Sequence, residues 1–86
     1  MPRFIAVHPG SFPEADLAGL AQRRGEMPEG VNWLCTWCAT GESVTYCDWD
    51  APSAEAIQGV LTEFGVPVDA IHEVRYFEPD AGKFVA

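Results

Sequence analysis

Basic residues are scarce in this chain, which carries five Lys and Arg against thirteen Asp and Glu and has a formal net charge of -8 over 86 residues. Binding to a nucleic-acid backbone or to an anionic lipid surface depends on clustered cations, so this balance argues against both as partners. The acidic residues are scattered along the sequence and form no tail, which makes solubility their simplest role.

Long apolar runs and paired cysteines are also missing. No run approaches the roughly 18 apolar residues that a membrane span needs, and no basic and apolar leader opens the sequence. The cysteine count of three is odd, and the spacing shows no regular framework, which argues against a secreted disulfide scaffold. We expect a soluble cytoplasmic protein with reduced thiols.

The residues that are present predict one α+β domain over residues 1–86. Strand and helix patterns follow in the order β-α-β-β-α-β, which is typical of the ferredoxin-like fold. That fold has a four-stranded antiparallel sheet, with the first and third strands at its centre and two helices on one face. The expected elements are strands over 3–8, 31–39, 43–50 and 71–77, helices over 13–24 and 54–64, and an irregular tail over 79–86.

The two expected helices have clear end signals. Ser11 followed by Glu14 is the spacing of a capping box at the start of the first helix. Ser53 is placed to cap the second helix, and Gly65 predicts a Schellman stop in which Val66 lies near Leu61.

All three cysteines and all three tryptophans fall between residues 31 and 50, on a predicted hairpin with its turn at 40–42. A three-residue turn there pairs Cys35 with Cys47 and places Cys35 and Cys38 on opposite faces, which argues against a C-x-x-C metal or redox site. Strand alternation then predicts an aromatic wall on one face. This wall is either packed between two subunits or lines a ligand pocket, and it comprises Trp33, Cys35, Trp37, Cys47 and Trp49.

The two histidines are candidate metal ligands. His8 closes the first strand and His72 opens the last, so antiparallel pairing of these neighbours predicts both imidazoles at one end of the sheet. Together with the Cys47 thiolate, or with a carboxylate such as Asp48 or Asp50, they would suit zinc or nickel. Asp48 lies on the other face of its strand, where it needs Arg75, Arg3 or water as a partner.

Both hairpin strands are apolar on both faces, although the helices of so small a domain cover only one face of its sheet. We therefore expect the other face to meet a second copy in a homodimer.

Three segments, 31–34, 46–57 and 65–74, resemble a small bacterial family whose founding member is described as a nickel-binding protein. The resemblance spans roughly residues 3–79 and implies a dimeric α+β barrel in which the sheets of two subunits face each other. Val7-His8 and Cys47 match positions of the metal-binding members, whereas neither predicted helix has the histidines that those members carry. The resemblance thus supports the fold more strongly than nickel binding.

These patterns predict a homodimer that binds a small ligand or a transition metal, nickel or zinc, in a cleft at the dimer barrel. One alternative is a cofactor-free oxygenase or isomerase that uses His8 or His72 as a general base beside the aromatic pocket. A purely structural dimer is the other. No motif identifies a catalytic residue.

Overall fold

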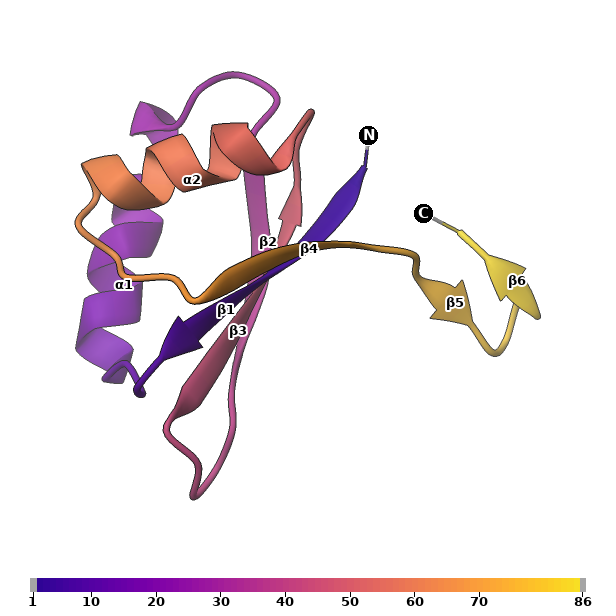
Figure 1. Cartoon of the computed structure of the whole chain (residues 1–86), viewed down its shortest axis with the longest axis horizontal. Coiled ribbons are helices and arrows are strands. Elements are labelled where there is room, and N and C mark those ends of the chain that lie inside the picture. The colour runs from indigo at the N-terminus through magenta and orange to yellow at the C-terminus, as the bar shows by residue number, and fades with distance from the viewer. Residues whose placement is uncertain (1, 86) are drawn as a thin grey trace.

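The computed structural model describes residues 2–85 and has the expected order of helices and strands (Figure 1). Two short strands follow the predicted β-α-β-β-α-β unit at the C-terminal end. The elements are β1 (Arg3–Pro9), α1 (Glu14–Gln22), the 3-10 turn η1 (Arg24–Glu26), β2 (Asn32–Cys38), β3 (Val44–Asp50), α2 (Ala54–Glu63), β4 (Ala70–Val74), β5 (Phe77–Glu78) and β6 (Lys83–Phe84).

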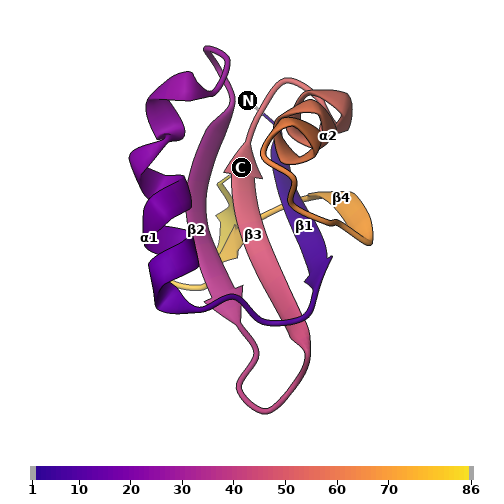
Figure 2. The same ribbon diagram turned by 90° about the vertical axis from the view of Figure 1, so that its left-hand side faces the viewer.

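The main sheet has the strand order β2-β3-β1-β4, and each neighbouring pair is antiparallel. β1 and β3 occupy the centre, as the crossover rule predicts. Both helices cover the same face of the sheet, as Figure 2 shows. The chain therefore has the ferredoxin-like α+β fold. Neither helix among the described residues is long and apolar enough to cross a bilayer.

The predicted ends of α2 are confirmed, whereas the predicted start of α1 is not. Ser53 Oγ accepts a hydrogen bond from the Ala56 N–H at 3.2 Å. Gly65 has φ +71° and donates to the Thr62 carbonyl, and the Val66 N–H donates to the Leu61 carbonyl at 2.8 Å, which is the Schellman pattern. The predicted capping box is wrong because α1 begins at Glu14, with Pro13 as its cap residue and no side-chain cap.

The register of the β2–β3 hairpin differs from the predicted one. Trp33 pairs with Trp49 as expected, but a bulge between Trp33 and Cys35 inserts one extra residue on β2. Cys35 therefore pairs with Asp48, and Cys47 pairs with Thr36. An insertion of one residue turns every following side chain to the other face, so the predicted Cys35–Cys47 pair and the single five-residue wall are wrong.

The core lies between the sheet and α2. Buried apolar side chains come from β1, β3, the inner side of α2 and the adjoining loop residues Val31 and Ala51, whereas α1 contributes no buried residue. The buried cluster consists of Phe4, Ala6, Val31, Cys47, Trp49, Ala51, Ile57, Val60 and Leu61. α2 is consequently packed tightly on the sheet, and α1 is held more loosely.

The opposite face of the sheet is not covered by helices (Figure 1). We call it the open face. The last strand of the sheet ends at Val74, three residues earlier than predicted. The tail, predicted as irregular, instead forms a small hairpin in which Phe77 pairs with Phe84 and Glu78 with Lys83.

Candidate functional site

His8 lies near the end of β1 with its side chain on the helix-covered face, and it is 0% exposed. Its Nδ1 is 2.8 Å from the Pro67 carbonyl oxygen. A carbonyl oxygen only accepts hydrogen bonds, so Nδ1 carries the proton and Nε2 presents a lone pair in the neutral imidazole. Nε2 is buried without a partner among the described residues. The imidazole is thus fixed in one tautomer with an unused acceptor.

A small pocket lies beside His8, between the helices and the sheet. It is partly open to solvent, has a volume of about 30 Å³ and is lined almost wholly by apolar and aromatic side chains. The lining residues are His8, Phe12, Leu17, Leu20, Met27, Trp33, Cys47, Trp49, Val60, Leu61, Phe64 and Val66. The ring of Phe12 packs edge to face on the imidazole, with ring centroids 5.9 Å apart. The second polar atom buried without a partner in the described part of the chain, Trp49 Nε1, belongs to another lining residue.

The hairpin side chains of this pocket hold each other in place. The rings of Trp33 and Trp49 stack with centroids 6.4 Å apart. Trp33 Nε1 donates to Thr36 Oγ1 at 2.8 Å, and that oxygen lies 3.1 Å from Cys47 Sγ. Because Thr36 Oγ1 accepts from Trp33, its own hydrogen is free to point at the sulfur. The Trp33 indole therefore has a partner, which leaves Trp49 as the unused donor.

Burial raises the pKa of the Cys47 thiol above its ordinary value of 9.0, and the hydrogen bond with Thr36 opposes this only in part. The thiol is therefore neutral at pH 7. A neutral buried thiol packs as a small apolar group and is a poor metal ligand or nucleophile.

The raised pKa of Cys47 predicts a loss of stability at high pH. As pH rises past 9.0 the thiol of the unfolded chain ionises first, whereas the folded thiol keeps its proton. The free energy of unfolding should fall there by at most about 1.4 kcal/mol per pH unit. Urea denaturation between pH 7 and 10 checks this, with Cys47→Ala as the control that removes this part of the slope. Parallel pH profiles for the two proteins would contradict the assignment.

The structure divides the predicted site residues between the two faces of the sheet. His8, Trp33, Cys47 and Trp49 line the pocket. Cys35 and Trp37 lie on the open face because of the bulge in β2. His72 pairs with Ile5 of β1, three residues before His8, and so shares the open face with Ile5. The two histidines are therefore not brought together. Phe12 and Met27 also line the pocket, and no motif in the sequence marks them.

The donors of the pocket do not fit a nickel or zinc ion. Among residues 2–85, no group of three or more His, Cys, Asp or Glu side chains is arranged to hold a metal. His8 is joined in the pocket only by Cys47, whose raised pKa disfavours the thiolate that binds metals. The predicted ligand set of His8, Cys47 and His72 thus does not assemble within one chain.

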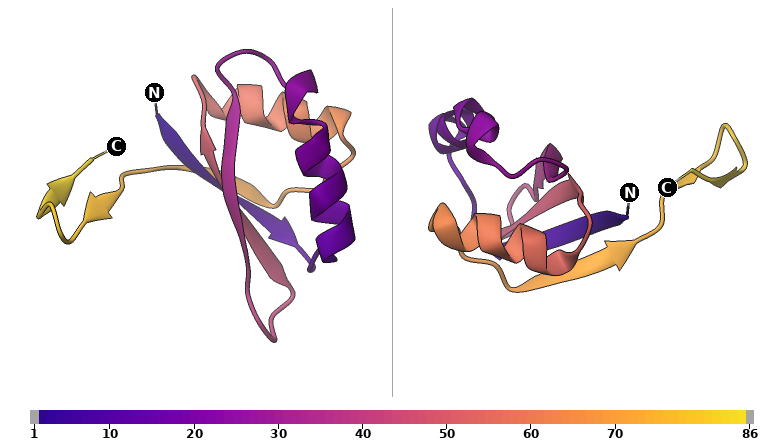
Figure 3. Two further views of the ribbon diagram at one scale, coloured as in Figure 1. Left: turned by 180° about the vertical axis from the view of Figure 1, so that it is seen from behind. Right: turned by 90° about the horizontal axis from the view of Figure 1, so that it is seen from above.

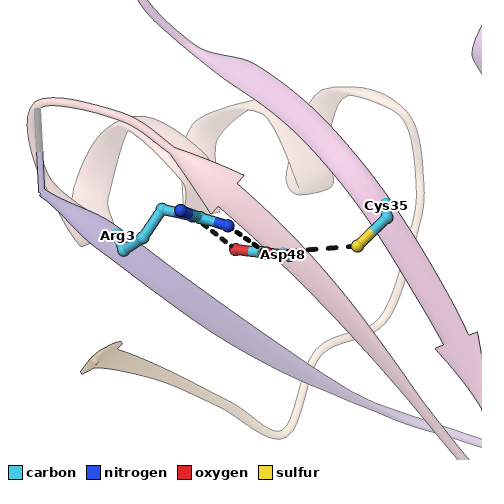
Figure 4. A network of polar contacts seen from close by, with 3 residues as sticks. All are labelled: Arg3, Cys35 and Asp48. Atoms are coloured by element: carbon cyan, nitrogen blue, oxygen red, sulfur yellow. Dashed lines mark hydrogen bonds and ion pairs between the residues drawn. The ribbon is translucent and has the colours of Figure 1, made fainter. Parts of the chain in front are cut away.

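A charged cluster lies on the open face (Figure 4). Arg3 Nε and Nη2 donate to the two carboxylate oxygens of Asp48 at 2.9 and 2.6 Å, which confirms Arg3 among the predicted partners of Asp48. Cys35 Sγ is 4.0 Å from Asp48 Oδ2. Burial, then the negative charge of Asp48, raises the pKa of Cys35, so this thiol is not activated. The cluster borders a hollow of about 400 Å³, whose walls include Trp37, Val74 and Tyr76.

Comparison with known proteins supports the ferredoxin-like fold and the resemblance of this chain to a small bacterial family. The family model described as "Nickel responsive protein SCO4226-like" matches residues 4–74. The crystal structure of SCO4226 from Streptomyces coelicolor A3(2) is similar to this chain, with a TM-score of 0.71 and 30% sequence identity. The match covers 84% of this chain and 94% of that one. No curated protein matches the sequence.

Proposed function

Since the chain belongs to the SCO4226-like family of nickel responsive proteins, we propose that it is a binding protein whose ligand occupies the pocket beside His8. The ligand is a small, neutral, largely apolar molecule that carries a hydroxyl group. One observation carries this proposal: a fully buried histidine presents an unpartnered acceptor nitrogen beside an apolar pocket.

The unpartnered nitrogen of His8, a residue that lines the pocket, suggests the chemistry of the occupant. An unsatisfied buried acceptor costs about 1–3 kcal/mol, which a hydrogen-bond donor recovers. His8 Nε2 has no donor among the described residues, and a hydroxyl group on the ligand supplies one. The rest of the lining is apolar or aromatic, apart from the Cys47 thiol, and holds no cationic side chain. A carboxylate there would lose its hydration without an opposite charge, so a neutral ligand fits better.

The size of the pocket limits the ligand to a small one. A cavity of about 30 Å³ holds a group of the size of water. Leu17 and Leu20 of α1 form part of its wall, and α1 has no buried residue. An element with little buried surface moves at low cost, so a ligand larger than water enters by displacing α1 outward.

Phenol and toluene are matched probes of this proposal, since they share a ring and differ by the hydroxyl group. We expect phenol to change the fluorescence of Trp33 and Trp49 saturably, and toluene to bind about tenfold more weakly because it leaves His8 Nε2 unpaired. Fluorescence titration measures both dissociation constants. Equal affinities, or no saturable change with phenol, would contradict a hydroxyl-binding pocket and leave water as the occupant.

The same geometry supports a second function, that of an enzyme with His8 as general base. Its Nδ1 is held by the Pro67 carbonyl, and this leaves Nε2 free to take a proton from a bound molecule. His72 lies on the open face, outside this pocket. A ligand recovered chemically unchanged after prolonged incubation would favour binding, and product formation that requires His8 would favour catalysis.

We also propose that the chain forms a homodimer through its open face in the cytoplasm. Trp37 is 53% exposed and Tyr46 is 36% exposed on this face, where they pair on adjacent strands. Covering such side chains removes apolar surface from water. The three cysteines are free, which suits a reducing compartment. Light scattering tests the assembly, and a monomer mass at micromolar concentration would contradict it.

A further inference from the structure

The C-terminal hairpin stands apart from the rest of the domain. Residues 75–85, which we call the arm, leave the sheet after β4 and extend on the side opposite the helices, as Figures 1 and 3 show. The family match ends at residue 74, so the arm lies outside it. The arm is thus a feature that the family resemblance does not explain.

The arm presents aromatic side chains that the chain itself does not cover. Tyr76, Phe77 and Phe84 are 48%, 49% and 47% exposed. Phe77 and Phe84 meet edge to face at 5.3 Å, and the guanidinium of Arg75 lies 3.7 Å from the centroid of Phe84. The arm touches the body at its root, where Arg3 lies 5.6 Å from the Tyr76 ring centroid.

A hairpin of this length requires a surface to pack on. β5 and β6 have two residues each, and an isolated two-stranded hairpin is at best marginally stable in water. The open face offers such a surface, because Trp37 and Tyr46 are exposed there. The hollow beside Trp37 is bounded by Ile5, Val74 and Tyr76, so it begins at the root of the arm.

From these features, and on the basis of the proposed dimer, we infer that the arm of each chain packs against the open face of a second copy. The arm extends away from its own sheet, which places its tip beyond its own open face (Figure 3). Each chain has one open face and one arm. A two-fold symmetric dimer therefore buries both open faces and both arms, and no exposed face or arm is left to bind a third chain. The partner is therefore a second copy of this chain.

Two variants of the 86-residue chain test whether each arm packs on the partner chain. The arm variant combines Phe77→Ser with Phe84→Ser, and the face variant combines Trp37→Ser with Tyr46→Ser. Each removes aromatic contacts from every arm and face pair in its own homodimer, so we expect the dimer dissociation constant of each to rise at least about tenfold. The control pair Glu78→Ala and Lys83→Ala alters the same two strands without the aromatic side chains and should dimerise as the natural chain does.

Mixing the two variants distinguishes an arm that packs on the partner's open face from an arm that packs on the open face of its own chain. An arm and face variant pair restores one intact arm against one intact face, so we expect heterodimers by native mass spectrometry. If each arm packs on the open face of its own chain, mixing the variants forms no heterodimers. The absence of heterodimers would therefore overturn the inference. Unchanged dimerisation of the arm variant would also overturn it while leaving the open-face dimer intact. Phenol binding lies on the other side of the sheet, so its loss or retention reports separately on the His8 pocket.

Discussion

Replacing Arg3 with alanine is expected to lower the free energy of unfolding by about 3 kcal/mol, because it leaves the Asp48 carboxylate buried without its partner. The side chain of Asp48 is 8% exposed and that of Arg3 is 22% exposed, and two hydrogen bonds join them. The remaining negative charge cannot be fully hydrated, and Cys35 is too weak a donor to replace a guanidinium. Urea denaturation at pH 7 measures the loss.

Two further variants show whether the cost comes from the unpaired charge. The double variant Arg3→Ala with Asp48→Ala removes both charges and should be more stable than Arg3→Ala alone. Arg3→Lys keeps the charge but loses the two-pronged geometry, so we expect an intermediate stability. A loss below about 0.5 kcal/mol for Arg3→Ala would place the pair among exposed salt bridges, which contribute little.

His8→Asn is expected to weaken phenol binding at least about tenfold while leaving the fold intact. The asparagine amide can donate to the Pro67 carbonyl as Nδ1 does, but it has no atom at the position of Nε2. The variant therefore removes the proposed ligand contact and keeps the structural hydrogen bond. A loss of one hydrogen bond to a buried acceptor corresponds to about 1.4 kcal/mol, or a factor of ten.

His8→Gln is the matched control, since its amide oxygen reaches toward the position of Nε2 and accepts a hydrogen bond. We expect it to retain more phenol affinity than His8→Asn, although it gives up the contact with Pro67. Circular dichroism and urea denaturation confirm that both variants fold. Equal phenol affinity in the natural chain and in His8→Asn would remove His8 from the binding site.

The fold was predictable from local signals that agree with each other. The Ser53 cap and the Gly65 stop define α2, and runs of β-branched and aromatic residues bounded by Gly and Pro turns define the strands. The crossover rule then sets the strand order, with β1 and β3 in the centre. The capping box at Ser11 was wrong because Pro13, not Ser11, precedes the first helical turn.

The hairpin register was not predictable from the turn alone. The sequence N-W-L-C gives no Gly or other marker at the bulge, yet one extra residue at Leu34 decides which face each later side chain of β2 occupies. For this reason Trp33 lies beside Trp49 as predicted, whereas Cys35 and Trp37 lie on the open face and not on the predicted one. Bulges without a glycine are visible only in the three-dimensional pairing.

Part of the lining of the candidate pocket could be inferred from the sequence. The clustered Trp and Cys residues lie on the hairpin, and the resemblance marked His8 and Cys47, which both line the pocket. The prediction that His8 and His72 lie together was wrong because antiparallel pairing brings two strand ends together without deciding which face each side chain occupies: His72 aligns with Ile5 and not with His8. The role of Pro67 in fixing the His8 tautomer depends on a contact 59 residues apart in sequence, which no local pattern reveals.

Nitrogen-15 NMR of the imidazole rings during a phenol titration tests the central claim most directly. Free protein should show His8 protonated at Nδ1 and unprotonated at Nε2, as its contact with Pro67 requires. Phenol should then shift the Nε2 resonance of His8 saturably, because its hydroxyl donates to that nitrogen, while His72 on the open face serves as the unaffected reference. A proton on Nε2 in the free protein, or an unchanged His8 resonance at saturating phenol, would contradict the proposed site.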